Sequence, residues 1–122
     1  MKAMQPKPIA IVVPQNAQSL DVSGPLDAFL EANRQAPGQC HYTVRLLSAG
    51  DGRTVKAGGL SLITDGSIFD DEGAIDTLLV AGTPDYAQAY TSTELHDWLR
   101  RRAPQTRRSA PQPIVKLGAR IG

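Results

Sequence analysis

The feature that most constrains the fold is a short apolar run followed by an acidic segment. Residues 9–13 are all apolar and mostly β-branched, as in central parallel strands that are covered on both faces. Pro14 ends this predicted strand because proline has no amide to give to a ladder. The segment 20–27 then places Asp21 in a loop at the carboxyl end of the sheet, where open α/β folds hold ligands. Asp21 is therefore the first candidate site residue.

A helix follows this loop. Ser23 and Gly24 are both possible N-caps, and Pro25 would occupy the first turn, where its missing amide costs nothing. Leu26, Phe29 and Leu30 would form the buried stripe of this helix.

The middle of the chain is predicted to form strands. Tyr42–Ser48 alternates between apolar and partly polar positions, which favours a place near the edge of the sheet. Thr54–Ala57 and Leu60–Ile63 flank Gly58 and Gly59 and are predicted to form a short hairpin.

A second apolar strand is predicted at 75–81, and it ends in Gly82 and Thr83. Small residues at such a position let backbone amides approach a ligand, although a plain turn is the alternative. Beyond it, Thr91 and Glu94 fit a capping box. The predicted helix buries Leu95, Trp98 and Leu99 and ends in three arginines at 100–102, which suit the negative end of its dipole.

The order strand, helix, strand, hairpin, strand, helix predicts an α/β domain with a parallel sheet and right-handed crossovers. We place this domain at residues 1–108 and an irregular, basic, proline-rich tail at 109–122. No apolar stretch is long enough to span a membrane and no signal peptide is evident, so we expect a cytoplasmic protein with no membrane partner.

The chemistry-bearing residues exclude several kinds of site. Cys40 is the only cysteine, which rules out an internal disulfide. With His41 and His96 as the only histidines, no metal-ligand spacing exists, and we predict neither a metal nor a cofactor. We expect Cys40 to be a partly exposed thiol and His96 a surface residue.

Charge is distributed unevenly along the chain. Residues 1–99 hold 12 acids and 6 bases, whereas residues 100–122 hold 7 bases and no acid. A basic end of this kind favours nucleic-acid contact or, equally, a solvated helix end with a tail. Because no aromatic residue follows Trp98, the end offers no platform on which bases could stack.

Four segments of the chain resemble a known family. They are residues 9–13, 19–29, 44–50 and 76–82, and the motif LDVSGPLD at 20–27 is the most specific part of the resemblance. Together they are similar to the first half of a ThiJ/PfpI domain, and in particular to the N-terminal sensor domain of AraC-type transcriptional regulators. The resemblance spans about residues 8–108 and implies an incomplete flavodoxin-like domain of the class I glutamine amidotransferase type.

The resemblance also implies a site. Enzymes of this superfamily set an acidic residue, here Asp21, against a cysteine on a strand-to-helix elbow. That cysteine would be expected soon after Arg108, but residues 109–115 read SAPQPIV. We therefore predict no catalytic residue and a ligand site at Asp21, Gly24, Gly82 and Thr83.

Three functions follow from these observations. The first is a non-catalytic, truncated or frameshifted sensor domain of an AraC-type regulator, which binds a small-molecule effector and lacks its DNA-binding helix-turn-helix. The second is a hydrolase or hydratase of the same superfamily, isonitrile hydratase-like or glyoxalase-like. The third is nucleic-acid contact through the basic end. Since half a sheet would leave the first strand or the 75–81 strand with an unpaired edge, we also expect homodimerisation or other self-association.

Overall fold

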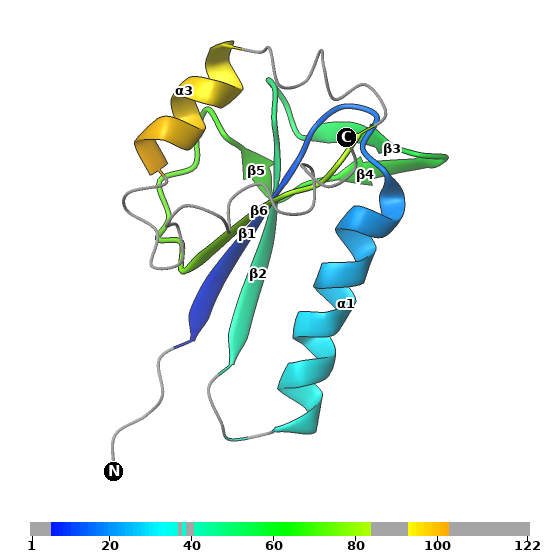
Figure 1. Cartoon of the computed structure of the whole chain (residues 1–122), viewed down its shortest axis with the longest axis vertical. Coiled ribbons are helices and arrows are strands. Elements are labelled where there is room, and N and C mark those ends of the chain that lie inside the picture. Colours follow the sequence, from blue (N-terminus) through cyan, green and yellow to red (C-terminus); the bar gives the residue numbers. More distant parts are fainter. Residues whose placement is uncertain (1–5, 37, 39–40, 84–92, 103–122) are drawn as a thin grey trace.

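The computed structural model describes residues 6–36, 38, 41–83 and 93–102 of the 122-residue chain. Four parallel strands form the main sheet in the order β5-β2-β1-β6 (Figure 1). Their bounds are β1 Lys7–Val13, β2 Tyr42–Ser48, β5 Gly66–Ser67 and β6 Thr77–Val80. A separate antiparallel hairpin joins β3 (Thr54–Ala57) to β4 (Leu60–Ile63). The predicted α/β class with a parallel sheet and a hairpin is confirmed.

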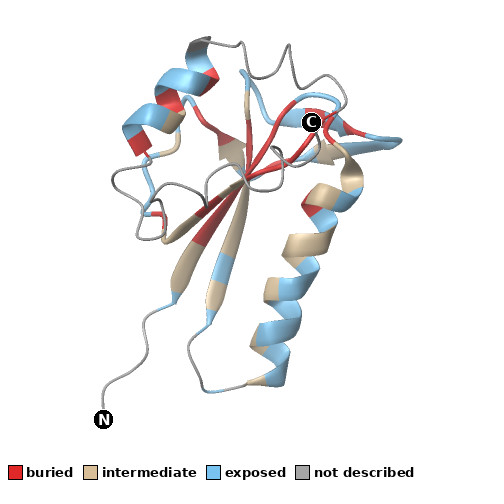
Figure 2. Ribbon diagram, in the orientation of Figure 1, coloured by how far each residue is buried: buried red, intermediate tan, exposed pale blue. Residues whose placement is uncertain are grey.

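The sheet is covered on both faces because successive side chains of a strand point to opposite sides. Ile9, Ile11 and Val13 of β1 pack with Val22 of helix α1 (Ser19–Gln35). Ala10 and Val12 pack on the other face with Leu95 and Trp98 of helix α3 (Thr93–Arg102). Residues 9–13 are fully buried, and the two helices flank the sheet in Figures 1 and 2. The prediction of a central strand is therefore confirmed.

Helix α1 starts earlier than predicted. It begins at Ser19, after Gln18, so neither Ser23 nor Gly24 caps it, and Pro25 lies inside the helix. The reason lies in the tertiary packing. Val22 is buried against the sheet, and the partly buried Leu26 and Phe29 pack against the same cluster. The stabilisation from burying this stripe outweighs the local preference for a helix that begins at proline. Asp21 is consequently a residue of the first helical turn and not of a loop.

The predicted strands keep their positions. The bounds of β2, β3 and β4 are as predicted, and β2 lies near the edge because only the two-residue β5 follows it. Strand β6 is shorter than the predicted 75–81, although Asp76 and Ala81 still donate amides to carbonyls of β1. An unpaired edge was expected at the first strand or at the 75–81 strand, and it is not at the first strand, since β1 pairs with β2 and β6. Among the described residues, β6 pairs with β1 alone.

The remaining predictions fall at the carboxyl end of the chain. Leu95 and Trp98 are buried in α3 and Leu99 is partly buried, as predicted. Thr91 of the capping box and the tail 109–122 lie outside the described residues. None of the helices in the described ranges is long and apolar enough to cross a bilayer.

Candidate functional site

Asp21 and Gly82, 61 positions apart, meet at the carboxyl end of the sheet. The Oδ2 atom of Asp21 accepts a hydrogen bond from the Gly82 amide at 3.2 Å. The Gly82 carbonyl in turn accepts a hydrogen bond from the Gln18 amide at 2.8 Å. The turn after β6 is thus held by the start of α1, and the half-buried Asp21 carboxylate is fixed in orientation.

Thr83 supports the same turn from inside. Its side chain is fully buried, and its hydroxyl donates a hydrogen bond to the Asn16 carbonyl at 2.9 Å. Asn16 has a φ of 63°, a left-handed conformation that asparagine tolerates better than most residues. The Asn16 amide donates to the Lys56 carbonyl, and the Lys56 amide donates to the Gln15 side chain. The hairpin therefore braces the turn between β1 and α1.

Of the four predicted site residues, the structure brings three together: Asp21, Gly82 and Thr83. Gly24 lies in the body of α1, one turn beyond Asp21. A Cβ atom added there would meet only the Leu20 Cδ1 atom, at 3.9 Å. Neither close packing nor a left-handed backbone requires a glycine at this position.

The other reactive candidates do not join this site. Cys40 lies outside the described residues. The carbonyl of the next residue, His41, accepts a hydrogen bond from the Lys7 amide at the amino end of β1, opposite to Asp21. His96 is exposed on α3, as predicted. The described part of the chain contains no group of three histidine, cysteine or acidic side chains that could hold a metal ion.

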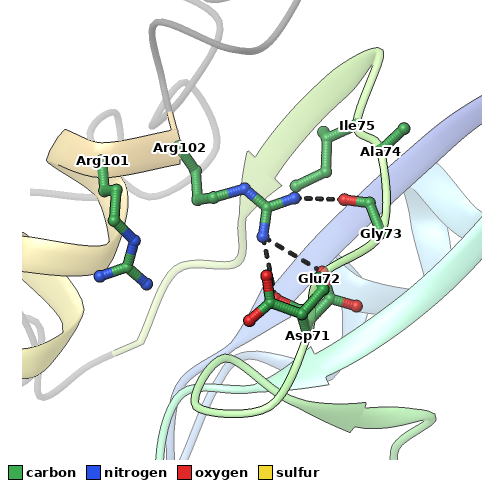
Figure 3. A pocket seen from close by; sticks show the side chains of 7 residues that line it. All are labelled: Asp71, Glu72, Gly73, Ala74, Ile75, Arg101 and Arg102. Carbon is green, nitrogen blue, oxygen red and sulfur yellow. Dashed lines mark hydrogen bonds and ion pairs between the residues drawn. The ribbon is translucent and has the colours of Figure 1, made fainter.

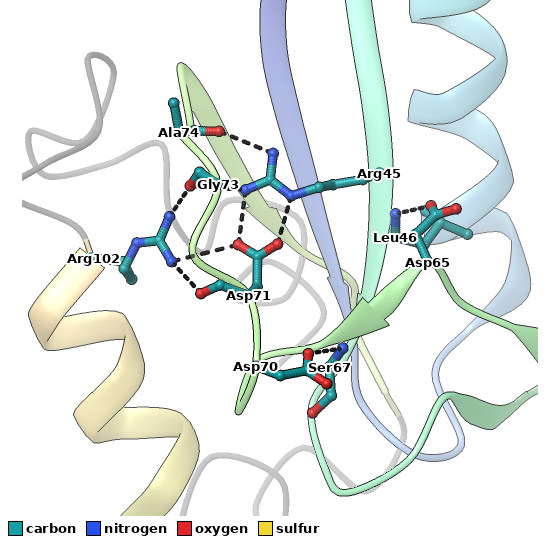
Figure 4. A network of polar contacts seen from close by, with 9 residues as sticks. All are labelled: Arg45, Leu46, Asp65, Ser67, Asp70, Asp71, Gly73, Ala74 and Arg102. Atoms are coloured by element: carbon teal, nitrogen blue, oxygen red, sulfur yellow. Dashed lines mark hydrogen bonds and ion pairs between the residues drawn. The ribbon is translucent and has the colours of Figure 1, made fainter.

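A second polar cluster, centred on Asp71, was not predicted from the sequence (Figure 4). Arg45 of β2 binds Asp71 in a bidentate manner, through Nε at 2.9 Å and Nη2 at 2.8 Å. Arg102, the last residue of α3, donates to the Asp71 carbonyl at 3.0 Å and lies 3.4 Å from its carboxylate. One carboxylate thus ties α3 and β2 to the segment that precedes β6.

Arg102 corrects the expectation of a solvated arginine end. Its side chain is 10% exposed, and its guanidinium lies over the Trp98 ring, 5.4 Å from the ring centre. It also donates to the Gly73 carbonyl. Since Arg102 is bound inside the domain, it is not available for phosphate contact.

Gly73 permits this arrangement. A Cβ atom at this position would lie 3.1 Å from the Arg45 Nη2 atom, closer than most side chains come. The acidic turn at 70–73 and the arginine within the Tyr42–Ser48 strand were the signals that could have revealed the cluster.

The fold was compared with known proteins. No protein-family profile matches the chain, and no curated protein does. Among the solved structures that are similar in fold, three align with about four-fifths of this chain. The VC2308 protein superposes with a TM-score of 0.64 at 21% identity, over 79% of this chain and 46% of that chain. A cysteine-to-alanine mutant of the DJ-1 superfamily protein STM1931 from Salmonella typhimurium gives 0.65 at 14% identity, over 80% and 50%.

The third structure is a Bacteroides thetaiotaomicron protein provisionally named protease I, with a TM-score of 0.61 at 19% identity, over 80% of this chain and 55% of that chain. The chain therefore spans about half the length of each structure that it matches. At these identities the likeness establishes the fold alone. The chain has the fold of part of a DJ-1/ThiJ/PfpI superfamily domain.

Proposed function

We propose that the chain is a ligand-binding part of a DJ-1/ThiJ/PfpI-like domain and that it acts without catalysis. The observation that carries this proposal is the Asp21–Gly82 hydrogen bond. It fixes one carboxylate oxygen of Asp21, while the other oxygen makes no hydrogen bond with the described residues. A fixed, half-buried carboxylate at the carboxyl edge of a parallel sheet suits a ligand that donates hydrogen bonds, such as an amine, an amide or a polyol.

Binding is favoured over catalysis because Asp21 lacks a nucleophile to activate. A carboxylate that tunes a nucleophile must lie within hydrogen-bond reach of it. The nearby Thr83 hydroxyl is committed to the Asn16 carbonyl. The only cysteine, Cys40, precedes the β2 strand in the chain, whereas Asp21 lies beyond the carboxyl end of β1.

The biological role that we propose is that of a sensor in an AraC-type transcriptional regulator. This finer assignment is supported by the sequence resemblance around LDVSGPLD at 20–27. A ligand at Asp21 would bridge α1 and the turn after β6, so binding would change the stability of both. A DNA-binding module would be the recipient of this signal.

The proposal is tested by adding donor-rich probes to the protein and following backbone amide shifts by NMR. We choose ethanolamine, acetamide and ribitol as probes. At least one should move the amide resonances of Asp21 and Gly82. Asp21→Ala should abolish the shift, whereas Asp27→Ala, at an exposed position on the same helix, should leave it intact. If none of the probes moves Gly82, the proposed site is wrong.

The alternative is a hydrolase or hydratase, which the name of the Bacteroides protein favours. It is distinguished by turnover of a peptide, an isonitrile and methylglyoxal. We expect no turnover by the purified chain. Turnover that is lost when Cys40 is alkylated, and also lost in Asp21→Ala, would overturn the non-catalytic proposal.

A further inference from the structure

A cleft of about 580 Å³ lies between the end of α3 and the segment that precedes β6 (Figure 3). Its lining residues are Asp71, Glu72, Gly73, Ala74, Ile75, Arg101 and Arg102. This volume is in the range of small-molecule sites. The cleft is separate from the Asp21 site, because its residues 71–75 lead into the amino end of β6 whereas Gly82 follows the carboxyl end of that strand.

Two charged residues of the lining are already bound to other groups of the domain. Arg102 is bound to Asp71 and Gly73 and stacks on Trp98. Asp71 also holds Arg45. Asp71 and Arg102 thus form a fixed wall of the cleft, since both side chains are largely buried and already hydrogen-bonded.

The other two charged side chains of the cleft have no charged partner among the described residues. Glu72 and Arg101 are both exposed, and neither is paired with the other or with another charged side chain of the described residues. Figure 3 shows Arg101 on α3 and Glu72 on the facing segment, with the Arg102 side chain reaching across to that segment. The lining also has an apolar part, formed by Ala74 and the 7% exposed Ile75.

We propose that this cleft binds a small zwitterion of the α-amino acid class with an apolar side chain. The carboxylate would pair with Arg101, the ammonium group with Glu72, and the side chain would contact Ala74 and Ile75. Arginine suits the first contact because its planar guanidinium matches a carboxylate in bidentate geometry. The charged lining residues are two arginines and two acids, which suits a ligand with no net charge.

The proposal is tested by NMR titration of the whole chain with L-leucine. Leucine should shift the amides of residues 71–75 and 101–102. N-acetyl-leucine lacks the ammonium group and leucinamide lacks the carboxylate, so both should bind more weakly. Equal shifts from all three compounds would overturn the zwitterion assignment, and no shift at about 10 mM L-leucine would overturn the site.

Two substitutions locate the contacts. Arg101→Gln and Glu72→Gln should each weaken leucine binding roughly tenfold, the loss of one charge-assisted hydrogen bond. Both positions are exposed, so the fold should be retained, as circular dichroism would verify. Arg100→Gln is the matched control, because Arg100 pairs with Asp97 and does not line the cleft. An Arg100→Gln effect as large as that of Arg101→Gln would contradict the proposal.

Discussion

The carboxylates of Asp21 and Asp71, near opposite ends of β6, have different surroundings. The half-buried Asp21 accepts one hydrogen bond from a backbone amide, whereas the Asp71 side chain is 11% exposed and contacts two guanidinium groups. The difference matters for stability because a buried charge that loses a partner is costly, while an exposed one is solvated by water.

Asp71→Asn should therefore be strongly destabilising. The amide that replaces one carboxylate oxygen cannot accept from the guanidinium groups of Arg45 and Arg102, both of which are mostly buried. We expect the free energy of unfolding to fall by about 2–4 kcal/mol, measured by urea denaturation. Asp97→Asn breaks an exposed ion pair with Arg100 and should cost less than about 0.5 kcal/mol. Equal losses in the two variants would show that the Asp71 cluster does not hold α3 in place.

At the scale of elements, helix α1 contains two residues that are uncommon inside a helix. Gly24 and Pro25 are adjacent within its 17 residues, and both are poor helix formers. The helix persists because its apolar stripe is buried against the sheet.

Gly24→Ala should stabilise the protein. The added methyl group has room, since its nearest neighbour would be the Leu20 Cδ1 atom at 3.9 Å, and alanine is favoured over glycine within a helix by about 0.5–1 kcal/mol. Thermal unfolding followed by circular dichroism should show a higher midpoint. A lower midpoint would mean that Gly24 is needed for close approach by another group.

Glu31, on the exposed face of α1, should titrate below the ordinary pKa of a glutamate. The pKa of the Glu31 carboxyl lies below its ordinary value because Gln35 donates a hydrogen bond to it, and Arg34 adds a second hydrogen bond and attraction. The sign is that of a depressed acid: the stabilisation is present above the ordinary pKa and is lost as pH falls through the folded-state value. In an NMR titration, Gln35→Ala should raise the pKa of Glu31. Arg100→Ala, on α3, should leave it unchanged.

At the scale of the whole molecule, the hairpin presents an apolar edge strand. The β4 segment Leu60–Ile63 contains neither a charge nor a proline and pairs only with β3 among the described residues. Leu60 is 52% exposed and Ile63 79% exposed. An apolar edge strand of this kind favours pairing with another chain.

We therefore expect concentration-dependent self-association in sedimentation velocity. Ile63→Lys should reduce it, because a charged side chain on an edge strand opposes pairing. Ala28→Lys, at an exposed position of α1, adds the same charge away from the hairpin and should have no such effect. A wild-type protein that sediments as a monomer at all concentrations would contradict this expectation.

The sequence alone determined the fold class and most strand positions. Runs such as 9–13 and Tyr42–Ser48 encode burial and alternation in their own side chains, so their pattern can be interpreted without a partner. The family resemblance also pointed to Asp21, Gly82 and Thr83, which the structure brings together at the carboxyl end of the sheet.

Only the tertiary structure decided where α1 begins and what Arg102 does. The start at Ser19 depends on packing of Val22 against the sheet, which outweighs the local signals of Ser23, Gly24 and Pro25. Arg102 resembles a solvated helix end in the sequence, yet it is bound by Asp71, 31 positions away. Such a contact depends on how elements meet in space, and the acidic turn at 70–73 does not by itself indicate that Arg102 is a partner of Asp71.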